Sequence, residues 1–386
     1  MRAPVGIALA LSLALTGCYG SHVRSVDGGP MPDAATCDPA SRPRCVERES
    51  PCDELTLVEP ACISAAWQCP DGAMLYARPW NDDRCLPLRD APLFADGVHE
   101  SPVPVPIGDH CEWIFPYQDG ASVQLLGVAS GTSCASLGAV TEPIDLPHAA
   151  DTYVNVEAAI VTPSGTRLLS RAWAFDASTV FGVRALGVEL GRVDASALRF
   201  DGTFLFGGRT DLGDAAIVVD GFAYAYGHPS TAMGLEADMV VGRAPIDAVD
   251  DDAAWEILGM GGWGSGEAVP VFGSGPHRSA VVRDPRGNGY LHVYAAGFGS
   301  DLRLNTAPAP EGPWTAAITL APCELPADDP GAYCAGPQVH RELLDPLAPS
   351  ELVVSYSIGS TSADQADRRM RNPDAYWPRI VRVALP

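Results

Sequence analysis

Asp220-Gly221-Phe222-Ala223-Tyr224-Ala225-Tyr226-Gly227 is a two-residue turn followed at once by alternating aromatic and small residues. Glycine at the second turn position supplies the positive φ that a tight hairpin needs, and aromatic residues favour strands. Four other turn-plus-strand units share this layout. Their second turn residues are Gly120, Gly165, Gly289 and Ser350. The five units recur at intervals of roughly 45 to 70 residues, which makes them a quasi-repeat.

Each unit indicates a strand entering the turn, a strand leaving it and usually another strand after a loop. Four short strands per ~40 to 60 residues are typical of one blade of a β-propeller. We therefore predict an all-β protein in which residues 91–386 form a five-bladed β-propeller. A β-sandwich or jelly roll, which also contains many short strands, stays open as the alternative.

The N-terminus has the layout of a bacterial export signal. A basic head at Met1-Arg2 precedes an apolar run over residues 5–15 that is too short to span a bilayer. Leu15-Thr16-Gly17-Cys18 follows and resembles a lipobox, which implies cleavage before Cys18 and lipidation of its thiol. Residues 1–17 are thus predicted to be a lipoprotein signal peptide.

The chain between this signal and the next cysteine is short of large apolar residues. Residues 18–36 include Asp27-Gly28-Gly29-Pro30 and are predicted to be a flexible tether. The resemblance to lipoproteins, with Tyr19 in place of an aspartate after the lipidated residue, implies the outer membrane. The lipid would face either the periplasm or the cell exterior.

Ten cysteines remain after Cys18, an even number that an oxidising compartment converts to disulfides. They form three groups along the sequence, and we predict pairing within each group: Cys37, Cys45, Cys52, Cys62, Cys69 and Cys85; Cys111 and Cys134; Cys323 and Cys334. Residues 37–90 are too small to bury much core, so they are predicted to form a disulfide-stapled module. A zinc site is the competing interpretation, but no Cys-x-x-Cys or His-x-x-x-His spacing supports it.

The composition excludes several kinds of chemistry. The chain of 386 residues has a formal net charge of −23, and its 25 basic residues are all arginine. Without lysine there is no phosphate-binding Walker lysine, Schiff-base lysine or kinase lysine. The acidic surface repels phosphate backbones, so nucleic acid is not an expected partner, and a neutral or cationic glycan is favoured over a phosphorylated one.

Motifs of three common enzyme classes are also missing. The sequence has no Gly-x-Ser-x-Gly elbow, no His-Glu-x-x-His pair, and no Gly-x-Gly-x-x-Gly placed between a strand and a helix. The sequence therefore does not indicate a serine esterase, a zincin or a dinucleotide oxidoreductase.

Several segments resemble known propellers. The segment Leu302–Trp314 ends in Ala307-Pro308-Ala309-Pro310-Glu311-Gly312-Pro313-Trp314 and resembles the strand-plus-turn signature of five-bladed glycosidase propellers. Four more segments resemble a bacterial propeller family long labelled as a domain of unknown function, whose members include endo-D-arabinanases: Asp220–Gly227, Arg243–Trp255, Val353–Tyr356 and Tyr376–Val383. The resemblance extends from about Gly108 to the C-terminus and implies a furanosidase-type propeller.

Candidate catalytic residues follow from where a propeller places its channel. The innermost strand of each blade lines the channel, so functional side chains are expected within or just before the strand that precedes each hairpin. Glycoside hydrolysis usually needs two carboxylates. We predict Asp109 as nucleophile or general base, Glu157 as general acid and Asp214 as the neighbour that tunes a pKa or orients substrate. This assignment places residues 108–113 on the innermost strand of the first blade.

Substrate-binding side chains are predicted on the same strands: Asn155, His277, Arg278, His340, Trp113 and Trp173. For each candidate a structural role is the alternative, such as a satisfied histidine, a tryptophan between blades, or a carboxylate paired with an arginine. We predict no cofactor. A calcium ion in the channel stays open, although Asp250-Asp251-Asp252 lacks the Asp-x-Asp-x-Asp-Gly spacing of a calcium loop.

These features predict a monomeric outer-membrane protein, attached to the membrane only through the Cys18 lipid. It would act as a glycoside hydrolase-like propeller on arabinan-like envelope or extracellular polysaccharide. The alternative is a catalytically inactive surface propeller that binds glycan or protein. Carboxyl groups within ~5–10 Å of each other across an open channel mouth favour hydrolysis. Carboxylates that point outward or pair with arginines favour the binding protein.

Overall fold

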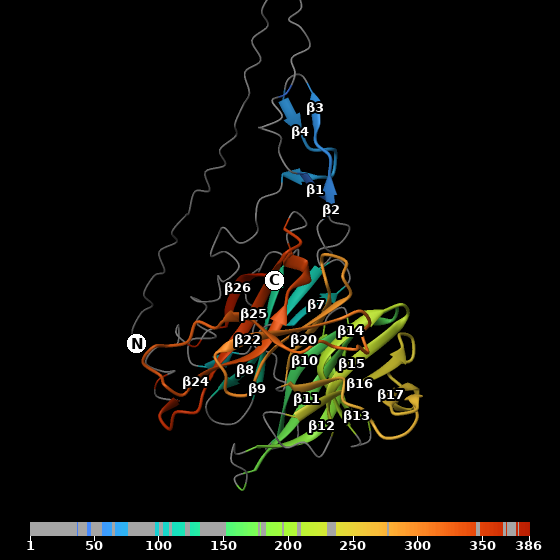
Figure 1. Cartoon of the computed structure of the whole chain (residues 1–386), viewed down its shortest axis with the longest axis vertical. Helices are drawn as coiled ribbons and strands as arrows, with labels where there is room; N and C mark the ends of the chain where they lie inside the picture. The colour runs from blue at the N-terminus through green and yellow to red at the C-terminus, as the bar shows by residue number, and fades with distance from the viewer. Residues whose placement is uncertain are drawn as a thin grey trace, which may run out of the picture.

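The computed structural model describes the following residues: 37, 45–47, 56–63, 66–75, 97–99, 103–107, 110–119, 124–131, 152–176, 178, 183–194, 197–206, 210–229, 237–275, 278–344, 348–365, 368, 376 and 378–386. Strands are the main regular element of these residues (Figure 1). No helix in this described part is long and apolar enough to cross a membrane. The predicted signal peptide, the Cys18 lipidation site and the tether lie outside it.

Five antiparallel sheets form the blades. The first contains β6 (Gly97–His99), β7 (Val103–Ile107), β8 (His110–Asp119) and β9 (Gln124–Gly131). The second contains β10 (Thr152–Thr162), β11 (Gly165–Phe175), β12 (Val183–Asp194) and β13 (Ala197–Leu205). The third contains β14 (Thr210–Val219), β15 (Phe222–Pro229), β16 (Ala237–Pro245), β17 (Glu256–Gly259), β18 (Gly262–Trp263) and β19 (Phe272–Gly275).

The last two blades come from the C-terminal part of the chain. The fourth contains β20 (Ala280–Arg283), β21 (Tyr290–Ala295), β22 (Asp301–Ala307) and β23 (Ile318–Pro322). The fifth contains β24 (Ala332–Val339), β25 (Glu351–Ser360) and β26 (Arg379–Ala384). In the fourth and fifth sheets consecutive strands are neighbours, so each of these two is an up-and-down meander.

One strand of every blade faces a common channel. β10 lies beside β7 on one side and β14 on the other, and β20 continues the ring to β24. All five of these strands contribute side chains to one cavity. The prediction of a five-bladed propeller is therefore confirmed. The predicted two-residue turn is present in the third blade, where Gly221 has φ of 79°. In the fourth blade Gly289 also has positive φ, 101°, but it ends a longer loop over residues 284–289.

The first blade differs from the prediction. β8, which begins at His110, pairs with β6 and β7 on one side and with β9 on the other, so it is the second strand of its blade. The innermost position belongs to β7, whose Val103 lines the cavity. Assigning residues 108–113 to the innermost strand was wrong. This strand, Val103-Pro104-Val105-Pro106-Ile107, is difficult to recognise in the sequence because it contains two prolines, which are rare in strands. They are tolerated because β7 is a sheet edge, where a missing N–H breaks no ladder.

A small disulfide-linked module precedes the blades. β1 (Cys45–Glu47) pairs with β2 (Thr56–Val58) and β5 (Met74–Leu75), and β3 (Ala61–Ile63) forms a hairpin with β4 (Ala66–Gln68). Such short strands bury little apolar surface, so covalent links contribute much of their stability.

Three disulfides are described, and each joins cysteines of one predicted group. Cys37 pairs with Cys62 and Cys45 with Cys69 in the small module. Cys323 pairs with Cys334 and links the segment after β23 of the fourth blade to β24 of the fifth. Cys52, Cys85 and Cys134 lie outside the described residues, and of Cys111 only the backbone is described.

The acidic run at Asp250-Asp251-Asp252 joins the second and third blades. Asp250 accepts a hydrogen bond of 2.7 Å from Nε of Arg167 in β11. Asp251 caps the 3-10 helix η6 (Asp252–Ala254), and Asp252 accepts the backbone N–H of Phe206. Each carboxylate of the run therefore has protein donors.

Candidate functional site

Two of the predicted carboxylates lie at irregularities of their strands. Glu157 stands where the pairing of β10 with β11 shifts register, and Asp214 where the pairing of β14 with β15 does. A third shift occurs in β24 between Ala335 and Gln338, and Nε2 of Gln338 lies 3.4 Å from the carbonyl oxygen of Glu157. Bulges redirect side chains and are common beside active sites. Three blades thus carry a register shift in their innermost strand.

Asp214 is enclosed by hydrogen-bond donors. Its side chain has no exposed surface, and its Oδ1 accepts from Nη2 of Arg171 at 2.6 Å. The same oxygen lies 3.3 Å from the backbone nitrogen of Arg278, while Nε2 of His228 lies 3.3 Å from Oδ2. A buried charge requires such partners, because desolvation of an unpaired carboxylate is very costly.

Arg171 is the cation at the centre of this region. It comes from β11, is fully buried, and donates to both Asp211 and Asp214. Burial lowers the pKa of Arg171, but the charges of Asp214, Asp211 and Glu157 raise it above its usual value. The guanidinium therefore stays ionised. We call Glu157, Asp211, Asp214, Arg171 and Arg278 the ion cluster.

Arg278 connects the two predicted carboxylates. Its backbone N–H faces Asp214, and its Nε lies 3.8 Å from Oε2 of Glu157. The residue has φ of 69°, a left-handed conformation that a side chain with a Cβ adopts at a cost. Its Cδ would lie 3.2 Å from a Cβ at Gly336, so the arginine packs directly on that glycine. Backbone strain of this kind is concentrated at functional sites.

Beside the ion cluster, Asn155 carries a buried polar atom without a hydrogen bond within the described residues. Asn155 pairs with Arg171 across β10 and β11 and is 9% exposed, and its Oδ1 has no hydrogen bond within the described residues. Trp173, two residues along β11, is half-buried, and the Arg171 guanidinium lies 5.8 Å from its ring centroid. An unsatisfied acceptor next to an aromatic face suits a ligand with both hydroxyl groups and C–H surface.

The remaining predicted residues are elsewhere or are not described. His340 is fully buried, and its Nε2 lies 2.7 Å from the hydroxyl of Ser355, so the structure places this histidine in the interior. Asp109 and His277 lie outside the described residues, and Trp113 is described only as backbone within β8. Among the residues that are described, no group of three or more His, Cys, Asp or Glu side chains could hold a metal ion.

Sequence reasoning missed Arg171, Asp211 and His228. An arginine inside the apolar strand Leu168-Leu169-Ser170-Arg171-Ala172 was a signal, since an ionised side chain there needs a buried partner. Asp211 and Asp214 belong to one strand, and their three-residue spacing places both near one arginine only because of the bulge between them. No pattern in the sequence predicts that bulge.

The comparisons with known proteins agree with this architecture. A family model described as "Domain of unknown function (DUF5005)" matches residues 121–385, so the chain belongs to that family. No curated protein matches the sequence significantly.

Solved structures resemble the chain at low sequence identity. One is a "putative hydrolase" of Bacteroides ovatus, with a TM-score of 0.54 and 16% identity over 77% of this chain and 89% of that chain. Another is the GH43_1 enzyme of Xanthomonas citri in complex with xylose, with a TM-score of 0.48 and 13% identity over 77% of this chain and 93% of that one. The protein is thus a member of a family of unknown function, and its five-bladed propeller fold is shared with the hydrolase-like structure of Bacteroides ovatus.

Proposed function

We propose that the protein binds a polysaccharide at the channel mouth beside the ion cluster and does not cleave it. The observation that carries this proposal is the pairing of the predicted catalytic carboxylates. Oδ1 of Asp214 is bound by Arg171, and Oε2 of Glu157 lies 3.8 Å from Nε of Arg278; the two residues are 0% and 3% exposed. A nucleophile or general acid must reach the sugar, whereas carboxylates held by guanidinium groups serve better to fix the site's shape.

The binding groups are those that the ion cluster holds in place. Oδ1 of Asn155, which has no hydrogen bond within the described residues, would accept a sugar hydroxyl, and the half-buried ring of Trp173 would stack on the sugar. Three carboxylates against two guanidinium groups leave the ion cluster with negative net charge when His228 is neutral. Together with the acidic surface, this supports a neutral or cationic polysaccharide of the envelope or exterior, such as an arabinan.

Affinity electrophoresis and calorimetry with arabinan, arabinogalactan and xylan test the proposal. One of these polymers should bind saturably, and Asn155→Leu should weaken that binding about tenfold, the usual effect of losing a hydrogen bond inside a site. Because Oδ1 of Asn155 has no hydrogen-bond partner among the residues that the structure describes, the variant should keep its melting temperature. Asn288→Leu, at an exposed hairpin turn, is the matched control and should bind like the parent. Equal binding by both variants would remove Asn155 from the site.

Hydrolysis is the second candidate, favoured by the convergence of Glu157 and Asp214 from adjacent blades onto Arg278. In that case Glu157 would act as general acid, Asp214 would orient substrate and Asp109 would act as nucleophile or base. Release of reducing ends by the parent but not by Glu157→Gln would support this candidate and contradict the first.

We further propose that the protein is a monomeric lipoprotein of the outer membrane, attached through Cys18. The tetrapeptide at residues 15–18 supports this assignment. Metabolic labelling with a palmitate analogue should mark the parent and leave Cys18→Ala unlabelled. Labelling of both would place the lipid elsewhere, and labelling of neither would refute the anchor.

A further inference from the structure

A cavity of about 390 Å³ lies in the channel beyond the ion cluster. Its wall begins at Ala158, Ala215 and Ser279, each directly after a residue of the ion cluster, and continues along the same strands. At the other end stand Val161 and Val218, which are 50% and 39% exposed. The cavity therefore opens to solvent on the side away from the ion cluster. Its volume falls in the range of small-molecule sites, ~300 to 1,000 Å³.

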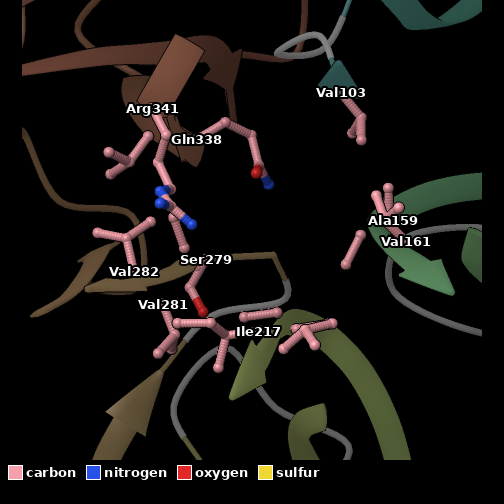
Figure 2. Close-up of a pocket in the computed structure, with 15 residues that line it drawn as sticks. Val103, Ala159, Val161, Ile217, Ser279, Val281, Val282, Gln338 and Arg341 are labelled. Carbon is pink, nitrogen blue, oxygen red and sulfur yellow. The ribbon is translucent and has the colours of Figure 1, made fainter. Parts of the chain in front are cut away.

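The wall of this cavity has two chemically different sides (Figure 2). Ser279, Gln338 and Arg341 come from the fourth and fifth blades and lie on one side, together with Val281 and Val282. The opposite side is apolar, with Val103, Ala159 and Val161. A sugar would leave most of its hydroxyl groups without partners against such a surface, which is costly. The cavity thus suits a ligand of different chemistry from the polysaccharide at the mouth.

Ser279 provides an independent indication of a ligand. Its side chain is 1% exposed and lines the cavity, yet its Oγ has no hydrogen-bond partner within the described residues. A buried hydroxyl without a partner costs free energy that a bound polar group would restore. Gln338 and Arg341, on the same side, carry amide and guanidinium donors, and a guanidinium cannot accept a hydrogen bond.

We propose that the cavity binds an aliphatic monocarboxylate, a site independent of the polysaccharide site. The carboxylate accepts from the Ser279 hydroxyl and the donors of Gln338 and Arg341. The aliphatic chain packs against the valines and alanines of the first three blades, where apolar burial provides the driving force. The hydrogen-bond donors on one side favour an anionic head group over an amine. The apolar surface on the other side favours an aliphatic chain over a sugar.

Titration of the full chain with octanoate, followed by calorimetry, tests the site. Octanoate should bind saturably, and octanol, which has the same chain without the charge, should bind about tenfold or more weakly because it loses the charge-assisted bonds. Val218→Glu places a negative charge at the exposed opening and should weaken octanoate binding, whereas the matched Val218→Lys should not. Both substitutions are at a position exposed enough to leave the melting temperature unchanged.

A second pair of variants keeps the proposal falsifiable. Ser279→Ala should weaken octanoate binding and keep or raise the melting temperature, since it removes an unsatisfied hydroxyl. Ala159→Phe should fill the cavity and abolish binding, with far-UV circular dichroism confirming the fold. An absence of saturable octanoate binding, equal affinity for octanol, or full binding by Ala159→Phe would each overturn the proposal. None of these outcomes depends on whether the polysaccharide binds.

Discussion

Two buried regions of the propeller differ in the charge of their ionisable side chains. In the ion cluster, Arg171 is fully buried and charged, with Asp211 and Asp214 as direct partners. In the aromatic cluster between the third and fourth blades, His292 is equally buried but neutral. Its ring stacks on Phe272 at 4.0 Å and on Tyr294 at 4.8 Å, and its Nδ1 lies 3.3 Å from Oδ1 of Asn305.

Both Arg171 and His292 are removed from water, so the difference in their charge comes from the neighbouring side chains. Burial lowers the pKa of His292 to about 3, because Asn305 and the charge of Asp214 compensate only partly. Arg171 experiences the same desolvation, but adjacent carboxylates outweigh it. The Arg171 charge is therefore kept because carboxylates of its own and the neighbouring blade lie against it.

Removing the central cation should have the largest effect. Arg171→Met leaves Asp211 and Asp214 buried without their partner, and breaking a buried pair in this way costs about 3–5 kcal/mol. Arg303→Met is the matched control, because Arg303 is 37% exposed and lies 3.6 Å from Asp301. It should cost less than about 1 kcal/mol. Urea unfolding measures both, and equal losses would contradict a special role for the ion cluster.

The aromatic cluster should make stability depend on pH. The pKa of His292 is about 3 in the folded protein against 6.5 unfolded, so the unfolded chain binds the proton first as pH falls. Its contribution to stability is full above the unfolded pKa and decreases as pH drops towards 3. Between pH 6.5 and about pH 5 the decrease should be about 1.5 kcal/mol.

His292→Phe should remove that part of the pH dependence while keeping the stacked ring. Urea unfolding at several pH values compares the slopes of the parent and the variant. An unchanged slope would mean that the histidine titrates normally and that the two regions do not differ as described.

The smallest effect on stability is expected at Arg278, which has a strained left-handed backbone. Arg278→Ala and Arg278→Gly both remove the guanidinium near Glu157, but only glycine adopts φ of 69° without cost. The glycine variant should be the more stable by about 0.5–1 kcal/mol, measured by thermal unfolding. A more stable alanine variant would show that the backbone relaxes there and that the left-handed conformation is not required.

The sequence predicted the architecture better than it predicted the site. Glycine turns such as Asp220-Gly221 and Asn288-Gly289 encode local backbone geometry, and for this reason the blades could be counted. The site depends on bulges and on pairing between blades, which have no local signature. Glu157, Asp214 and Arg278 were predicted on the channel strands, but Arg171, the partner of Asp214, was not. The first-blade strand was misplaced because its prolines resemble a loop.

The central claim is that the propeller binds a polysaccharide without cleaving it. The most direct measurement is a reducing-end assay with the polymer that binds, using protein in molar excess over a long incubation. We expect saturable binding and no increase in reducing ends, for the parent and for Glu157→Gln and Asp214→Asn alike. An increase with the parent that disappears in Glu157→Gln would contradict the account and identify the ion cluster as catalytic.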